Sequence, residues 1–435
     1  MSSPSAVYDV IALGGGLCGK AASMQLATAG LRVLCIEPAD AARQAVGESL
    51  DWSAPDLLSG LGLPMQDLVS ERMATWKRHV TMKLRDGSSE HYVPGGWLAT
   101  PPFRVELRTL HVDRSRLDEE LLKRTLASGA TIVRDTVVRV QRNGDKLAAV
   151  HTAGGEKFSS SWFIDASGFA ASLLPREFDL PAIQFGPAKV AIWTYFALAD
   201  LVEGTTLYME PLPSEYLDWV WEIPISTRVV SVGYVTTGAA MKARREQGLS
   251  VEEIFRQQLL KFPRFEPLLQ AGPLGSCNVT SFRSRVYDGV AGPNWFVAGE
   301  AASMVDPITA NGMTAALRHA AEASALILKF RKRGSLPLHA RICYNRRILQ
   351  MAKFFNSGIE KILYEPAVRN RIGARASGTV YTTPAWSMNL AYARLKPKGI
   401  FKTYLFGLAL ALCRAAAWIF SECCKRLPRA AESAA

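Results

Sequence analysis

Residues 10–19 read VIALGGGLCG, and this stretch decides the fold: an apolar strand enters a glycine-rich turn, and an alanine-rich helix follows. Gly14, Gly16 and Gly19 match the pattern G-x-G-x-x-G. In that pattern the first glycine permits a tight turn, the second admits a pyrophosphate, and the third lets helix and strand pack closely. A second expected strand ends at Glu37, where a carboxylate can accept hydrogen bonds from ribose hydroxyls. This order predicts a dinucleotide site.

Length and composition predict a folded protein of two or three subdomains. The chain has 435 residues, of which 49% are hydrophobic and 21% are charged, so it can bury a large core. The first residues are polar and lack the apolar run of a secretory signal. The seven cysteines form no C-x-x-C pair, and the six histidines form no H-E-x-x-H motif. We therefore expect reduced thiols, a cytoplasmic protein and no metal site.

The positive charge is concentrated in the C-terminal quarter. Residues 329–435 contain 20 Lys or Arg and 4 Asp or Glu, a net charge of +16, whereas the whole chain carries +12. This excess indicates a solvated helical face, a surface that docks an acidic protein, or a surface that contacts anionic lipid. We expect no nucleic-acid partner, because no binding motif accompanies the charge.

An apolar helix is expected within this basic region. Residues 404–420, YLFGLALALCRAAAWIF, are apolar except for Arg414 and fall short of the roughly 20 apolar residues that span a bilayer. Three interpretations stay open: a core helix, an interfacial membrane helix flanked by Lys402 and Lys425, and a cover over a substrate entrance. The second would make the protein membrane-associated.

Further glycine and acid motifs follow at long intervals. They are HVDR at 111–114, DASG at 165–168, GEAA at 299–302 and DPITANG at 306–312. Between residues 188 and 237 the pattern changes to alternating strands rich in Trp, Tyr, Val and Thr, which predicts an antiparallel sheet separate from the parallel one.

In this order the motifs resemble those of the glutathione-reductase-like flavoproteins, in particular the flavin monooxygenase and tryptophan-halogenase group. The resemblance covers about residues 8–330. It implies an α/β fold with a glutathione-reductase-type FAD-binding domain, an antiparallel-sheet substrate domain and a helical C-terminal region. The expected division is 1–170 with 275–335 for the FAD domain, 171–274 for the substrate domain and 336–435 for the basic helical region. Part of 50–105 would lie on the substrate side.

The resemblance also implies FAD as the cofactor and assigns residues to it. Arg114 matches an arginine near the FAD phosphates, and Glu300 stands where the family usually has an aspartate on the ribityl chain. The remaining residues implied to hold the cofactor, besides the three glycines and Glu37, are Asp165, Gly168, Asp306, Pro307, Asn311 and Gly312. No second glycine fingerprint follows a later strand, so we expect electrons from a partner flavin reductase or from NAD(P)H that docks transiently.

Two segments look like marks of flavin-dependent halogenases. Residues 219–224, WVWEIP, match the signature W-x-W-x-I-P. Trp219 and Trp221 should share one face of a strand because they lie two apart, and we expect them at the catalytic site with their rings against a tunnel. Lys77 closes the segment ATWK, 29 residues beyond Glu48, which resembles the segment with the essential lysine of tryptophan halogenases. Lys77 is either a catalytic donor that holds or captures hypohalous acid, or a surface lysine.

A third mark is absent. Thr309 and Ala310 stand where tryptophan halogenases carry Glu-Ser, so the carboxylate that would polarise a lysine-bound oxidant is missing. We therefore place first a monooxygenase that uses reduced FAD, O₂ and a flavin C4a-hydroperoxide to hydroxylate an electron-rich aromatic. Its substrate would be an indole, a tryptophan or a phenol, free or within an acidic protein or carrier-bound peptide. The alternatives are a halogenase acting through hypohalous acid and Lys77, an isoprenoid-type reductase, and a flavin-binding scaffold without chemistry.

Overall fold

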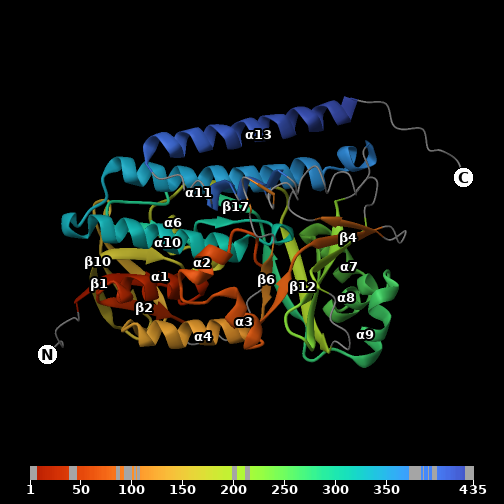
Figure 1. The fold of residues 1–435 in the computed structure, drawn as a ribbon, viewed down its shortest axis with the longest axis horizontal. Helices are drawn as coiled ribbons and strands as arrows, with labels where there is room; N and C mark the ends of the chain where they lie inside the picture. The colour runs from red at the N-terminus through yellow and green to blue at the C-terminus, as the bar shows by residue number, and fades with distance from the viewer. Residues whose placement is uncertain are drawn as a thin grey trace, which may run out of the picture.

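The computed structural model of the chain places two large sheets side by side beneath a layer of long helices (Figure 1). The residues that it describes are 7–38, 47–84, 89–92, 100–101, 104, 108–197, 203–210, 216–371, 384–385, 387–389, 391–393 and 399–426. The expected α/β class, with an antiparallel sheet and a helical C-terminal region, is confirmed.

The first sheet is built around the glycine-rich stretch. Its order is β7-β2-β1-β10-β9-β8, and β18 also pairs with β10. Strands β7, β2, β1, β10 and β18 are parallel, and β9 and β8 join antiparallel. The bounds are β1 Val7–Leu13, β2 Val33–Glu37, β7 Thr131–Arg134, β8 Val137–Asn143, β9 Lys146–Thr152, β10 Lys157–Asp165 and β18 Trp295–Val297. The apolar run of β1 is fully buried, as a central parallel strand requires.

The helix after the glycine turn packs against two helices that begin at later motifs. α1 (Leu17–Thr28) follows the glycine turn and packs against α4 (Arg114–Ala127) and α10 (Gly312–Phe330). The side chain of Asp113 accepts hydrogen bonds from the backbone N–H groups of Ser115 and Arg116, so it caps α4. The motifs near residues 111 and 312 are therefore brought to the same side of the sheet as the glycine turn.

The second sheet has the order β16-β12-β15-β14-β13-β4-β5 and is antiparallel except where β13 meets β4. Its strands are β4 Val80–Leu84, β5 Ser89–Tyr92, β12 Lys189–Ala197, β13 Thr205–Glu210, β14 Asp218–Pro224, β15 Val229–Thr237 and β16 Asn278–Phe282. One face packs on α7 (Gly238–Glu246), α8 (Val251–Leu259) and α9 (Glu266–Ala271). Trp219 and Trp221 lie on the opposite face.

Short elements link the two sheets. The pair β3 (Ala74–Lys77) and β6 (Thr109–Val112) forms a small antiparallel ladder, and β11, β17 and β19 form another. The remaining short elements are α2 Pro55–Ser59, α3 Met65–Ser70, α5 Gly168–Ala171, α6 Leu173–Glu177, β11 Ala182–Gln184, η2 Pro263–Phe265, β17 Arg285–Tyr287, η3 Gly299–Ala301, β19 Ser303–Met304 and η4 Pro307–Thr309. β4 and β5 thus enter the second sheet, while α2 and α3 pack on the first core. The exact domain boundaries stay a prediction.

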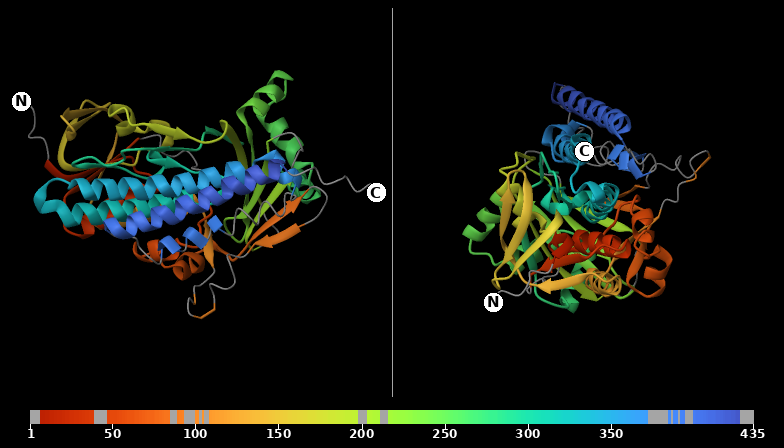
Figure 2. Two further views of the ribbon diagram at one scale, coloured as in Figure 1. Left: turned by 90° about the horizontal axis from the view of Figure 1, so that it is seen from above. Right: turned by 90° about the vertical axis from the view of Figure 1, so that its left-hand side faces the viewer.

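The C-terminal region forms a layer of long helices that lie side by side (Figure 2). α10 ends in the turn η5 (Arg331–Arg333), and α11 (Leu338–Gly358) runs on into the π-turn η6 (Ile359–Leu363). α13 (Ile400–Arg426) packs on α11 and is longer than the apolar stretch expected from the sequence. One side of α13, with Phe406, Leu410 and Cys424, is buried against the body as a core helix would be, but its outward side chains are exposed.

Candidate functional site

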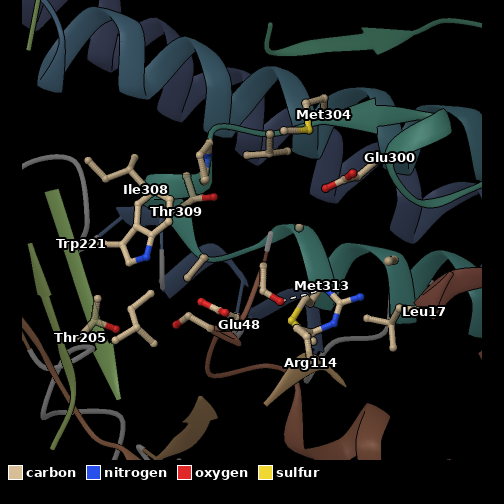
Figure 3. A pocket seen from close by; sticks show the side chains of 18 of the residues that line it. Leu17, Glu48, Arg114, Thr205, Trp221, Glu300, Met304, Ile308, Thr309 and Met313 are labelled. Atoms are coloured by element: carbon tan, nitrogen blue, oxygen red, sulfur yellow. Dashed lines mark hydrogen bonds between the residues drawn. The ribbon is translucent and has the colours of Figure 1, made fainter. Parts of the chain in front are cut away.

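A cavity lies between the glycine turn after β1 and the tryptophan-bearing face of the second sheet (Figure 3). Segments from nine parts of the chain line it. The lining residues that sequence analysis singled out are Gly16, Lys77, Arg114, Gly168, Trp219, Trp221, Glu300, Pro307, Thr309, Ala310 and Gly312. Cofactor motifs and halogenase marks therefore meet in one space.

The three glycines of the turn have different functions. A Cβ on Gly14, whose φ is +105°, would lie 2.5 Å from the carbonyl oxygen of Ala166, and a Cβ on Gly19 would lie 1.8 Å from that of Gly14. Both therefore permit close packing of strand and helix. Gly16 lines the cavity, and a Cβ there would meet no described atom within 4 Å. The space beside Gly16 is open for a ligand.

Glu37 lies at the end of β2, beneath the glycine turn and not among the residues that line the cavity. It is 1% exposed and forms ion pairs with Lys20 (3.0 Å) and Arg134 (2.7 Å). A Cβ on Gly15 would come within 2.0 Å of its Oε2 atom, so the carboxylate is in contact with the turn. Its bond to a ribose stays a prediction.

Arg114 presents a cationic group to the cavity from the first turn of α4. Its Nη1 atom donates to the carbonyl oxygen of Gly47 (3.0 Å), and its Nη2 atom donates to Asp118. Its Nε atom is buried and has no hydrogen-bond partner among the described residues. A buried guanidinium with an unused donor fits an anionic ligand such as a phosphate.

The motif around residue 306 forms a turn that leads into α10. Pro307 and Gly312 line the cavity, whereas Asp306 and Asn311 do not. The Asp306 carboxylate accepts from the N–H of Ile308 (3.1 Å) and so shapes the turn. The first N–H groups of α10 have no partner within the helix, and the helix dipole favours negative charge there. Glu300 faces this helix start, and burial raises the pKa of its carboxyl.

Asp165 lies directly before the cavity-lining residues Ala166 and Gly168 but does not itself line the cavity. It ends β10, is fully buried, and accepts hydrogen bonds from the N–H groups of Ser167 (3.0 Å) and Leu174 (2.7 Å). Burial raises the pKa of its carboxyl, and these hydrogen bonds oppose the rise. The structure thus shows Asp165 shaping the turn that exposes Gly168 to the cavity.

Lys77 is the last residue of β3 and lines the cavity while being only 1% exposed. Its Nζ atom donates to Ser49 Oγ (2.8 Å) and to the carbonyl oxygen of Leu50 (3.1 Å), and it lies 4.7 Å from the ring centre of Trp52. Burial lowers the pKa of the amine to about 7, and Asp51 opposes this. Lys77 is therefore not a surface lysine.

We expect Lys77→Met to stabilise the fold without FAD, by on the order of 2 kcal/mol at pH 6, because it removes a desolvated amine. The pKa of Lys77 is about 7 when folded and 10.5 when unfolded, so the unfolded chain holds an extra proton between these values. The free energy of unfolding of the natural chain therefore rises with pH across this window, and the advantage of the variant shrinks. Urea unfolding at pH 6, 8 and 9.5 measures both effects. Equal stability at pH 6 would contradict the burial of a charged amine.

Trp219 and Trp221 line the cavity with their rings and use their N–H groups elsewhere. The Nε1 of Trp219 donates to the Tyr364 hydroxyl (2.9 Å), and that of Trp221 donates to Ser231 Oγ (3.1 Å). The hydroxyl of Thr75 donates to the carbonyl oxygen of Pro224, which joins the two segments that carry the halogenase marks. The two indoles therefore offer an aromatic wall to a planar ligand.

Comparison with known proteins identifies the family. The model of the tryptophan halogenase family matches residues 102–357, more than half of the chain. The chain belongs to this family. A lycopene cyclase model also matches residues 9–186, the part that holds the glycine turn. A flavin-dependent halogenase of Armillaria mellea, armH5, is 26% identical over 73% of this chain and 64% of its own length, and the halogenase PltM has been solved in complex with FAD.

Relatives and solved structures agree with this. The tryptophan 2-halogenase of Chondromyces crocatus is 26% identical over 75% of this chain and 62% of its own length. The 1H-pyrrole-2-carbonyl-[peptidyl-carrier protein] chlorinase of Pseudomonas fluorescens is also 26% identical, over 74% of this chain and 76% of that enzyme. The flavin-dependent brominase Bmp2 is 19% identical, with a TM-score of 0.73 over 96% of this chain and all of that one. The chain spans less than two thirds of the tryptophan 2-halogenase.

This tryptophan-halogenase-family cavity also contains a carboxyl that sequence analysis did not assign. Glu48 points into the cavity (Figure 3), and its Oε1 atom accepts from the Tyr195 hydroxyl (2.7 Å). Burial raises the pKa of this carboxyl to about 7. Hydrogen bonds with Ser231 and Tyr195 lower the pKa and offset only part of this rise. The pair Gly47-Glu48, which follows the first two strands of the nucleotide-binding sheet, is a sequence signal from which this carboxyl could have been predicted.

A second group that sequence analysis missed is a buried ion-pair network beside the motif at 306. Lys189 Nζ lies 2.7 Å from Asp306 and 2.9 Å from Glu360, and Lys189 is 1% exposed. The Tyr364 hydroxyl lies 3.2 Å from both Asp306 carboxylate oxygens and also accepts from Trp219. A lysine at the start of an apolar strand was the only sequence signal for it.

Proposed function

We propose that this member of the tryptophan halogenase family is an FAD-dependent halogenase that directs hypohalous acid with Lys77. Its substrate is an electron-rich aromatic ring, an indole, phenol or pyrrole, free or attached to a carrier protein. The observation that carries the proposal is the buried Lys77 amine in the same cavity as Gly16 of the glycine turn and the two indoles. The halogenase names of the relatives also favour halogenation over the hydroxylation expected first.

The residues present fit FAD. The open space beside Gly16 and the unused Nε donor of Arg114 suit a pyrophosphate, and the start of α10 suits the ring of a reduced flavin. When bound and reduced, FAD supplies two electrons to O₂. The overall balance is one halide, one proton, one O₂ and one reduced FAD giving hypohalous acid, water and oxidised FAD.

Lys77 would act on the hypohalous acid. Its amine has two hydrogen bonds to the protein, and a pKa near 7 keeps both protonation states populated. The ammonium can donate a hydrogen bond to the oxidant, or the free amine can take the halogen with loss of water. The halogen then bonds to a ring carbon, and that carbon loses a proton. Glu48, with a carboxyl pKa near 7 in the same cavity, is the group placed to accept it.

Hydroxylation is the second candidate. Thr309 and Ala310 line the cavity at the positions where a carboxylate would polarise the lysine-bound oxidant, and neither side chain carries one.

Mass spectrometry of the product distinguishes halogenation from hydroxylation. The purified chain is supplied with FAD, a flavin reductase with NADH, O₂ and bromide, together with an indole, a phenol or a pyrrole on a carrier protein. We expect a product with the bromine isotope pair. A gain of one oxygen without bromine, in the presence of excess bromide, would instead establish the hydroxylase.

A further inference from the structure

The outer face of α13 is a continuous apolar surface. One side of this helix packs on α11 through residues that include Phe406 and Leu410. The opposite side, here called the outer face, carries eight large apolar side chains that are 43% to 79% exposed. They are Ile400, Phe401, Tyr404, Leu405, Leu408, Leu412, Trp418 and Ile419. They make up eight of the fifteen exposed large hydrophobic side chains in the described part of the chain.

Charge is absent from the middle of the outer face and present at its ends. Lys402 is exposed near the start of α13, and Lys425 and Arg426 are exposed at its end. Arg414, halfway along, donates to Gln350 of α11 and so is held on the inner side. An apolar stripe with basic ends is the pattern of a helix that lies in the interface of a bilayer, with its cations among the headgroups.

The surroundings extend this pattern. The turn η5 contributes three exposed cations, Arg331, Lys332 and Arg333, at the end of the helical layer where α11 and α13 begin (Figure 2). Two further apolar side chains, Leu338 and Ile342, are 65% and 41% exposed at the start of α11. The net charge of +16 beyond residue 328 also favours anionic over neutral lipids.

We propose that the outer face of α13 binds the surface of an anionic lipid bilayer and holds the enzyme there as a peripheral protein. The helix would lie in the plane of the interface. α13 is the one described helix that is long and apolar enough to cross a membrane. Its inner side, however, makes charged contacts with α11. Arg347 donates to Thr403 (3.3 Å), and Arg414 of α13 donates to Gln350 (3.3 Å). Spanning would move these contacts into hydrocarbon, whereas lying flat keeps them.

No residue of α13 is among the described residues that line the cavity. The interpretation of this helix as a cover over the substrate entrance therefore has no support in the described residues. Changes on the outer face should leave turnover of a small soluble aromatic unchanged, and this activity serves as a check on folding.

Vesicle flotation with the full FAD-loaded chain tests the proposal. Vesicles of phosphatidylglycerol and phosphatidylcholine should carry the protein, and pure phosphatidylcholine vesicles should carry about tenfold less. The triple variant Leu405→Gln, Leu412→Gln, Trp418→Gln should lose at least about tenfold in binding to the anionic vesicles. The control Leu126→Gln, Leu260→Gln changes two leucines elsewhere that are about half exposed, and it should bind as the natural chain does.

Two results would overturn the proposal. The first is that anionic vesicles leave the natural chain at the bottom of the gradient, or carry the triple variant equally well. The second is a dimer, detected by light scattering, that the triple variant converts to monomer while vesicles bind neither form. That outcome would assign the outer face to a second copy of this chain.

Discussion

Replacing Lys77 by methionine is expected to lower the rate of aromatic halogenation by at least about 100-fold while reduced FAD still reacts with O₂ at its normal rate. Methionine is unbranched like lysine and only one heavy atom shorter, so it should keep the packing of β3 while it removes the amine that lines the cavity. Hypohalous acid would then leave the cavity without being directed. A soluble trap for hypohalous acid should therefore gain what the aromatic substrate loses.

The neighbouring residue provides the control. Arg78 follows Lys77, is exposed and forms an ion pair with Glu203 (3.4 Å). Arg78→Met should leave halogenation within about twofold of the natural rate, since surface ion pairs contribute little. If Lys77→Met also kept its halogenation rate, Lys77 would have no catalytic role. The proposed mechanism would then lose its central group.

Replacing Gly16 by valine is expected to weaken FAD binding by at least about 100-fold, close to 2.8 kcal/mol, without unfolding the chain. A Cβ at this position meets no described atom within 4 Å beyond its chain neighbours, and the φ of Gly16 is −70°, so a valine should not strain the fold. It would occupy the space beside the turn in which we place the pyrophosphate. Titration followed by flavin fluorescence measures the affinity, and circular dichroism checks the fold.

Variants of two other glycines serve as controls for Gly16→Val. Gly275→Val places a side chain in equally open space away from the cavity and should bind FAD normally. Gly19→Ala would place its Cβ 1.8 Å from the carbonyl oxygen of Gly14, so loss of FAD there would report a damaged turn. If Gly16→Val retained FAD as tightly as the natural chain, the pyrophosphate would lie elsewhere.

The parts of the site that could be predicted from the sequence are those with short, regular spacing. The glycine turn depends on neighbours within ten residues, and Trp219 and Trp221 share a face because strand side chains alternate. Lys77 was placed by its similarity to a family segment, and that similarity could not distinguish a buried amine from an exposed one. Its burial depends on Trp52 and Leu50, which the chain brings there by folding.

The features that were not predicted depend on contacts between distant residues. Lys189 and Asp306 are 117 positions apart, so no local pattern reveals their ion pair. In α13 the buried Phe406 and Leu410 and the exposed Leu405 and Leu412 are chemically alike. Between its charged ends α13 carries apolar residues on nearly every side, so the sequence does not tell which side faces the protein, and the packing on α11 decides this.

The hydrogen-bond chain from Trp219 through Tyr364 to Asp306 restricts how the catalyst can be redesigned. An engineer who replaces Trp219 to admit a bulkier substrate also releases the hydroxyl that steadies the turn in front of α10. Trp221 is the better starting point, because its partner Ser231 belongs to the adjacent strand of the same sheet. A library begun at Trp221 can widen substrate scope while leaving the flavin-side turn intact.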